Sequence, residues 1–178
     1  MAKFEQVNRL KHLNLPLPKR STTAAAGYDF VVAEDTIIPP YCDHMLVLLD
    51  AVSDPSREFT LSEIEELTKG LKTRPTLVPT GMKCQLAPNQ YLELSTRSSS
   101  PYKAWLVLAN GVGIIDADYY NNEYNEGEIF FQIINFTPFT IKLHQGERIG
   151  QGIIKTYDLT EDDITTEKRS GGFGSTGE

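Results

Sequence analysis

Residues 110–119 gather side chains that could bind a polar ligand and act on it. The segment places the amide of Asn110, the carboxylates of Asp116 and Asp118 and the phenol of Tyr119 within ten residues, and its glycines permit a tight hairpin. An Asn side chain and hairpin amides can read the edge of a planar base, and a regular strand would put both carboxylates on one face. The same pattern is typical of an ordinary turn with carboxylates in solvent.

A second segment, 95–101, has a composition suited to phosphate. Five hydroxyl side chains surround Arg97, whose guanidinium donates hydrogen bonds in a fork while each hydroxyl donates one. Pro101 favours the first helical position, so Ser98 and Ser99 would precede a helix whose N-terminal amides add to an anion site. A solvated loop has the same composition.

The C-terminal residues 169–177 have the side chains that a cover over a nucleotide would need. Phe173 can stack on a base, Ser175 and Thr176 can donate to phosphates, and glycines such as Gly174 let the backbone approach closely. By composition alone, the segment is a flexible tail or the end of a linker.

Charge and hydropathy restrict the partners. The 178 residues include 17 Lys and Arg against 24 Asp and Glu, for a formal net charge of -7. This is the wrong sign for a protein held to nucleic acid by its overall field, so we expect no nucleic-acid partner and a locally bound anion. The longest apolar runs are far below the roughly 20 residues that span a bilayer, so we expect no membrane association and a cytoplasmic location.

Short β-branched and aromatic stretches between Gly and Pro predict a mainly β fold, a sandwich or barrel. The expected strands are 28–32, 76–78, 91–95, 105–108, 128–135, 139–143 and 149–155. One helix of about three turns is predicted, because Thr60 and Glu63 form a capping-box pair followed by apolar residues at near-helical spacing. Cys42 and Cys84 have no metal-ligand spacing, and neither a zinc site nor a disulfide framework is predicted.

Taken together, these segments resemble the five ordered motifs of the homotrimeric dUTPases, or dUTP diphosphatases. Residues 26–29 match the first motif, 97–99 the second, 113–119 the third, 148–151 the fourth and 171–177 the fifth, with Asn110 at the expected distance before the third. The match spans residues 15–177 apart from an insertion, as in a Gram-positive or phage-like member.

The resemblance implies a jelly-roll-like β-barrel over residues 1–157, followed by a swapped C-terminal arm, residues 158–178, that carries the fifth motif. It also implies a homotrimer with shared active sites. In this family the third motif comes from one chain, the first, second and fourth from another, and the fifth from a third.

The implied reaction is Mg²⁺-assisted hydrolysis of dUTP to dUMP and pyrophosphate, which keeps uracil out of DNA and supplies dUMP for dTMP synthesis. By resemblance, Asp116 is the general base that activates a water for in-line attack on the α-phosphate. Asp29 would reach Mg²⁺ through water.

The resemblance also assigns the residues that would bind substrate. Tyr119 would stack under the deoxyribose and leave no space for a 2′-hydroxyl, and Phe173 would cover the uracil. Either Arg169 or Lys168 would meet the γ-phosphate. The full implied set is Arg97, Ser98, Ser99, Asn110, Gly113, Ile115, Tyr119, Gln151, Arg169, Phe173, Gly174, Ser175 and Thr176.

Two segments depart from the family pattern. Residues 41–75 intervene where family members usually need only a few residues, and they carry the predicted helix. We expect a surface subdomain there, either a stabilising cap on the trimer or a docking surface for a protein partner. Residues 120–127 replace a short turn after Tyr119, and we expect a longer loop beside the site.

Two other functions compete with the hydrolase. A nucleotide-gated regulatory protein would bind a partner through the insertion, but the intact Asp116 and fifth motif favour an enzyme. The related dCTP deaminases need a differently placed glutamate base, whereas Asp116 occupies the dUTPase position.

Overall fold

A computed structural model describes residues 1–54, 56–71 and 74–166 of the chain. These residues form eleven strands, three α-helices and two short 3₁₀ helices, which confirms the mainly β prediction. The strands are β1 (Lys3–Gln6), β2 (Tyr28–Val31), β3 (Thr36–Ile38), β4 (Thr76–Pro79), β5 (Met82–Gln85), β6 (Gln90–Thr96), β7 (Leu106–Leu108), β8 (Gly113–Asp116), β9 (Phe130–Asn135), β10 (Ile141–Leu143) and β11 (Arg148–Thr156). The helices are η1 (Asn8–Leu13), α1 (Tyr41–Asp50), α2 (Leu61–Leu71), α3 (Ser99–Ala104) and η2 (Ala117–Tyr119).

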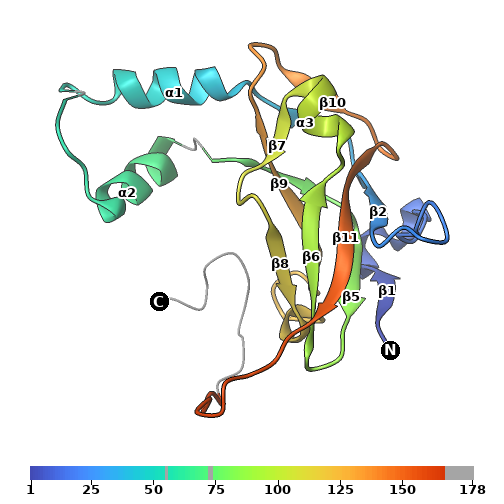
Figure 1. Cartoon of the computed structure of the whole chain (residues 1–178). Coiled ribbons are helices and arrows are strands. Elements are labelled where there is room, and N and C mark those ends of the chain that lie inside the picture. Colours follow the sequence, from blue (N-terminus) through green and yellow to red (C-terminus); the bar gives the residue numbers. More distant parts are fainter. Residues whose placement is uncertain (55, 72–73, 167–178) are drawn as a thin grey trace.

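Antiparallel pairing joins the described strands into four sheets (Figure 1). The largest has the order β2-β11-β6-β8, and a second has the order β4-β9-β7. The pairs β1-β5 and β10-β3 complete the set. The jelly-roll-like character is therefore present, but the described strands do not close into one continuously hydrogen-bonded barrel.

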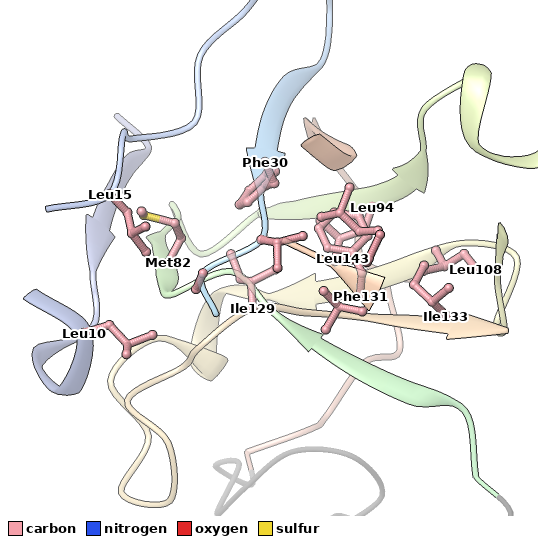
Figure 2. Packing of buried hydrophobic residues seen from close by; sticks show 14 of the residues in the cluster. Leu10, Leu15, Phe30, Met82, Leu94, Leu108, Ile129, Phe131, Ile133 and Leu143 are labelled. Atoms are coloured by element: carbon pink, nitrogen blue, oxygen red, sulfur yellow. The ribbon is translucent and has the colours of Figure 1, made fainter. Parts of the chain in front are cut away.

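One hydrophobic core lies between these sheets (Figure 2). Along β9, Phe131, Ile133 and Asn135 are buried while the residues between them are half-buried, which is the period of two expected for a strand with one core face. The rings of Phe30 and Phe131 pack edge to face with centroids 5.8 Å apart. The face of β9 that points away from the core is thus available to line a pocket.

Two glycines of β11 allow the aromatic core to pack directly on its backbone. A Cβ at Gly150 would overlap the ring of Phe131, and one at Gly152 would come within 2.8 Å of Leu92 and 2.9 Å of Phe30. Distances this short are not found between real side chains, so both positions require glycine. The residue between them, Gln151, is half-buried and lies on the opposite face of the strand.

The insertion contains two helices, whereas the sequence predicted one. The prediction of α2 is confirmed together with its capping box: the Thr60 amide donates to the Glu63 carboxylate at 2.9 Å, and the Glu63 amide donates to the Thr60 hydroxyl at 3.3 Å. The helix α1 was not predicted, because its first turn has no side-chain cap and its apolar residues 45–49 are consecutive, without a helical period. Both helices project away from the sheets (Figure 1).

Three local predictions near the candidate site were wrong. Pro101 is the third residue of α3 rather than the first, because the helix already begins at Ser99. The strands on either side of the turn at 109–112 do not form a hairpin, since β7 pairs with β9 and β8 pairs with β6. Asp116 and Asp118 do not share a strand face, because β8 ends at Asp116 and η2 begins.

Within the described residues, no helix combines the length and apolar character needed to cross a membrane.

The packing on β11 can be tested with Gly150→Ala. The added methyl group must displace the fully buried ring of Phe131, and overpacking of this kind costs about 1–3 kcal/mol. Urea denaturation should show that loss of unfolding free energy. In the control Gly70→Ala, on α2, the new Cβ meets no atom within 4 Å, and alanine favours the helix by up to about 1 kcal/mol. Equal stabilities for the two variants would contradict the packing argument.

Candidate active site

The sheet β2-β11-β6 brings together three of the chemistry-bearing segments. Across β11, Gln151 lies opposite Asp29 of β2 on one side and Ser95 of β6 on the other. Arg97 follows directly after β6, and Arg148 begins β11. Residues distant in sequence therefore converge because β11 is the shared neighbour of the two other strands.

Two arginines of this group converge on one carboxylate. The Asp29 carboxylate lies 3.9 Å from Nε of Arg97 and 3.5 Å from a terminal guanidinium nitrogen of Arg148, and it accepts a 2.7 Å hydrogen bond from the Ser21 hydroxyl. Two guanidinium groups facing one carboxylate leave an excess positive charge. This cluster (Asp29, Arg97 and Arg148) is thus a local cationic spot on an acidic protein, suited to an anion.

Gln151 extends over the backbone of the segment that precedes β2. A Cβ at Gly27 would collide with the end of the Gln151 side chain. Glycine at position 27 therefore leaves the space in which the Gln151 carboxamide lies beside the cationic cluster.

The predicted phosphate-binding serines lie at the start of α3. Ser98 is exposed and precedes the helix, Ser99 is half-buried in its first turn, and the Ser100 amide donates to the Arg97 carbonyl at 2.9 Å. This turn fixes the backbone between Arg97 and the serines.

A separate pocket of about 180 Å³ lies between β7, β8 and β9. It brings together four residues that the sequence singled out: Asn110, Gly113, Ile115 and Tyr119. A Cβ at Gly113 would stand 3.1 Å from Leu94, so a glycine here keeps the strand close to β6. A concave pocket that combines apolar side chains with a few polar groups is typical of a small-molecule site.

Several pocket residues were missed by sequence reasoning. Leu94 and Leu108 line the pocket, as do Phe130 and Gln132 on the non-core face of β9. The signal for Gln132 was its position: it is the one polar residue among five consecutive neighbours from 130 to 134 that are otherwise apolar. With Asn110, it gives the pocket two carboxamides that can each donate and accept hydrogen bonds.

Tyr119 forms a fixed wall of the pocket. Its side chain is only 3% exposed, and its hydroxyl donates to the Glu128 carbonyl at 2.9 Å and accepts from the Asn125 amide at 2.7 Å. A phenol held at both sides of its oxygen cannot rotate freely, so the ring presents a defined surface to a ligand.

Asp116 and Asp118 line a neighbouring, more open cavity of about 700 Å³. On β8, Ile115 lines the pocket and the next residue, Asp116, lines this cavity. The pocket and the cavity therefore meet the same short strand at successive residues, although they have no lining residue in common.

The loop 120–127 packs against the N-terminal part of the chain. The Glu126 carboxylate accepts hydrogen bonds from the backbone and side chain of Asn8, and lies 3.3 Å from Nζ of Lys83. The Asn121 side chain accepts from the same Lys83 at 2.6 Å. This loop is thus anchored to β5 and to the start of η1.

Comparison with known proteins agrees with this arrangement. A family model described as dUTPase matches residues 58–177, which include the pocket, the cavity and the cationic cluster apart from Asp29. The chain belongs to the dUTPase family. Over 176 residues it is 38% identical to the deoxyuridine 5′-triphosphate nucleotidohydrolase of Lactococcus lactis, covering 98% of this chain and 96% of the relative.

Solved dUTPase structures share the fold. The dUTPase of Streptococcus mutans superimposes with a TM-score of 0.67 at 38% identity, covering 89% of this chain and 98% of that chain. The dUTPase of phage phi11 of S. aureus, described with a species-specific insert, has a TM-score of 0.59 at 17% identity and covers 96% of this chain and 99% of that chain. The second likeness concerns the fold alone.

One dUTPase chain holds its two groups of site residues at different places on the same sheet. The pocket reaches from β7, β8 and β9 to Leu94 of β6, whereas Arg97 follows β6, Arg148 begins β11 and Asp29 lies on β2. From β6 to β2, two strand spacings amount to about 10 Å. The remaining predicted site residues, Arg169, Phe173, Gly174, Ser175 and Thr176, together with Lys168, lie outside the described residues.

Glu128, whose carbonyl holds Tyr119, also carries the most buried carboxylate of the described chain. Its side chain is 2% exposed and accepts two 2.9 Å hydrogen bonds from Arg9 and one of 3.1 Å from the Gly81 amide. Burial raises the pKa of the Glu128 carboxyl above its ordinary value, although Arg9 and Gly81 oppose the shift. Arg9 therefore limits the cost of keeping this group ionised.

We expect Arg9→Ala to make stability fall steeply with rising pH. A raised folded pKa means that folded Glu128 holds its proton more tightly than the unfolded chain does. The contribution of this tighter proton binding to the free energy of unfolding is therefore complete below about pH 4.5 and is lost as the pH rises through the folded pKa. Without Arg9 the pKa rises further, and the loss at neutral pH should reach about 3 kcal/mol.

Urea denaturation of wild type and Arg9→Ala between about pH 4 and about pH 8 measures how the free energy of unfolding changes with pH. The control is Glu34→Gln, which removes only the exposed partner of Arg9 and should cost less than about 1 kcal/mol. Parallel pH profiles for wild type and Arg9→Ala would show that Arg9 does not stabilise the Glu128 charge.

Proposed function

We propose that this protein is a dUTP diphosphatase, which hydrolyses dUTP to dUMP and pyrophosphate. Besides the family membership, one observation carries the proposal: a single pocket is lined by Asn110, Gly113, Ile115 and Tyr119, four residues to which the family resemblance assigns substrate binding. The base and sugar would occupy the pocket, and the α-phosphate would then lie near Asp116.

The pocket residues account for a preference for deoxyuridine. The Asn110 carboxamide and the backbone around Gly113 and Ile115 would pair with the uracil edge, and cytosine would leave mismatched donors at a cost of about 1–3 kcal/mol for each buried group. Tyr119 would lie under the deoxyribose and exclude a 2′-hydroxyl. Gln132 adds a second carboxamide to the same pocket.

The phosphates would bind at the cationic cluster. Arg97 supplies a forked donor, Ser98 a hydroxyl, Ser99 a backbone amide and Gln151 a carboxamide. The net charge of -7 does not oppose this binding, because the positive charge is concentrated where two arginines face one carboxylate.

The described residues fit a Mg²⁺ ion held mainly by the substrate. They contain no group of three or more His, Cys, Asp or Glu side chains able to hold a metal by themselves. Asp29 is already engaged by Ser21, Arg97 and Arg148, which suits a carboxylate that reaches the ion through water. Bound to triphosphate oxygens, Mg²⁺ would neutralise part of the developing charge.

Asp116 would act as the general base. A carboxylate within hydrogen-bond reach of a water can orient it and take its proton as the oxygen attacks the α-phosphorus and pyrophosphate leaves. Asp118 is exposed on η2 and lines the same cavity, but it has no assigned role in this reaction.

A homotrimer would unite the two groups of residues that one chain holds at different places. The pocket of one subunit would face the cationic cluster of a second, as the family resemblance implies. We assign residues 1–157 to the body of the subunit and residues 158–178 to the arm, from which Arg169 or Lys168, Phe173, Gly174, Ser175 and Thr176 would complete the site.

The alternative is a nucleotide-gated regulatory protein whose partner binds residues 41–75. The observation that favours this alternative is the set of apolar side chains that α1 exposes, among them Met45, Leu46 and Leu49. None of these three packs into the core. This alternative requires nucleotide binding without turnover, so the assay below decides between the two functions.

The first test is pyrophosphate release with Mg²⁺ from dUTP, dCTP, dTTP and UTP by wild type and Asp116→Asn. We expect release from dUTP only, with kcat of the variant lower by about 10²- to 10⁴-fold because the base is lost while the side-chain shape is kept. Binding of a non-hydrolysable α,β-imido analogue of dUTP should be preserved. Tight binding by the wild type without turnover would refute the enzyme and support the regulatory alternative.

A second test uses Gly27→Ala to displace Gln151. The new methyl group meets the carboxamide end of the Gln151 side chain most closely and its Cβ at 3.2 Å, a tight contact, so the carboxamide is pushed aside at a modest cost in stability. We expect the affinity for the triphosphate analogue to fall by about three- to tenfold, the value of one hydrogen bond, with the affinity for dUMP altered less. Equal losses for both ligands, or none, would exclude Gln151 from triphosphate binding.

A further inference from the structure

We propose that Asn125 is a positioning residue of the substrate pocket and that it acts through the hydroxyl group of Tyr119. The proposal rests on the proposed function, because it deepens the role of Tyr119 in binding the deoxyribose of dUTP. It assigns a function to the loop 120–127, the segment that departs from the family pattern.

The hydrogen bonds at the Tyr119 oxygen have a fixed direction. The hydroxyl has one proton, which it gives to the Glu128 carbonyl at 2.9 Å, so its lone pairs remain as acceptors. The Asn125 amide nitrogen, a pure donor, fills one of them at 2.7 Å. Asn125 therefore supports the one orientation in which the hydroxyl points to Glu128.

The other half of the Asn125 side chain is held equally firmly. Its carbonyl oxygen accepts from the Asn122 side-chain amide at 2.8 Å and from the Gly127 backbone amide at 3.1 Å. Asn122 in turn donates to the Tyr119 carbonyl at 2.9 Å and accepts from the backbone amide of Asn125 at 3.0 Å. Both ends of the Asn125 carboxamide are thus occupied, and no rotation of the amide satisfies the same partners.

The loop backbone is shaped to make these contacts. Asn121, Glu126 and Gly127 adopt positive φ angles of 57°, 59° and 79°. At Gly127 a Cβ would stand 2.9 Å from the Cα of Tyr120 and closer still to the Tyr119 carbonyl oxygen, so the chain turns back tightly beside Tyr119. Glu126, bonded to Asn8 and near Lys83, ties this turn to the body of the subunit.

The consequence for function follows from the position of the ring. Tyr119 lines the pocket, and its hydroxyl is the end by which the ring is held. Losing the Asn125 donor removes one of the two hydrogen bonds described at that end, so the ring should be held less firmly in the pocket. Affinity for the nucleoside and discrimination against ribose should both fall, while Asp116, on the preceding strand, keeps its place.

The test is a double-mutant cycle on Asn125→Ala and Tyr119→Phe, with Asn125→Asp as a variant of the same shape. A carboxylate in place of the carboxamide can still accept from Asn122 and Gly127 but cannot donate to the phenol. The control is Tyr124→Ala, in the same loop, whose side chain is 85% exposed. The measurements are the Kd of the α,β-imido analogue of dUTP, KM and kcat for dUTP and UTP, and the melting temperature.

We expect Asn125→Ala, Asn125→Asp and Tyr119→Phe each to raise Kd and KM for the deoxynucleotide by about three- to tenfold, with kcat within about twofold of wild type. The ratio of kcat/KM for dUTP over UTP should fall. In the Tyr119→Phe background, Asn125→Asp should change Kd little further, because the phenol oxygen to which Asn125 donates is then absent and the bonds from Asn122 and Gly127 are kept. Tyr124→Ala should resemble the wild type.

Additive effects in the cycle would overturn the proposal, as would a lowered melting temperature with unchanged Kd, which is what a purely structural role predicts. Wild type that binds the analogue but does not hydrolyse dUTP would refute the proposed activity. The Kd values of the Asn125 and Tyr119 variants would still test whether Asn125 positions Tyr119. The two failures are therefore distinguishable.

Discussion

The contact of aromatic rings with the bare backbone of β11 is the constraint on which the arrangement of this protein depends. Gly150 and Gly152 have no room for a Cβ, because Phe131, Phe30 and Leu92 occupy that space. With bare backbone at these two positions, β11 can lie close to the core while pairing with β2 and β6 on either side. The polar residue between the glycines, Gln151, is then directed to the opposite face, beside Asp29 and the segment that carries Arg97.

The same constraint explains how an acidic chain can bind a polyanion. Because β11 is shared, residues from three separate segments meet over a few ångströms, and Asp29 holds two guanidinium groups in one place. A carboxylate between two arginines orients both cations and still leaves a positive excess. The overall charge of -7 affects the long-range approach of an anion, whereas the local field at the cluster depends on this arrangement.

The sequence predicted the residues of the pocket better than the strands and helices that position them. Short motifs such as 110–119 carry their residue types visibly, and the pocket indeed unites Asn110, Gly113, Ile115 and Tyr119. The strands β1, β3, β5 and β8, which the sequence did not predict, have three or four residues each, but so do the predicted β2, β4, β7 and β10, so length alone does not explain the omission; α1 lacks a helical period. Nor could the sequence show that β7 and β8 enter different sheets, because pairing is decided by the register of β6 and β9 far along the chain. Gln132 lines the pocket because β9 pairs with β7, and the sequence could not show this pairing either.

The loop 120–127 shows how side-chain hydrogen bonds can position a pocket wall. Asn122 and Asn125 bond to the carbonyl and the hydroxyl of Tyr119, and Glu126 attaches the loop to the N-terminal segment. Hydrogen bonds fix the direction of the phenol more sharply than apolar contacts, which are not directional. The longer loop thus makes the pocket wall depend on the beginning of the chain, since Asn8 and Arg9 support Glu126 and Glu128, the two carboxylates that flank Gly127.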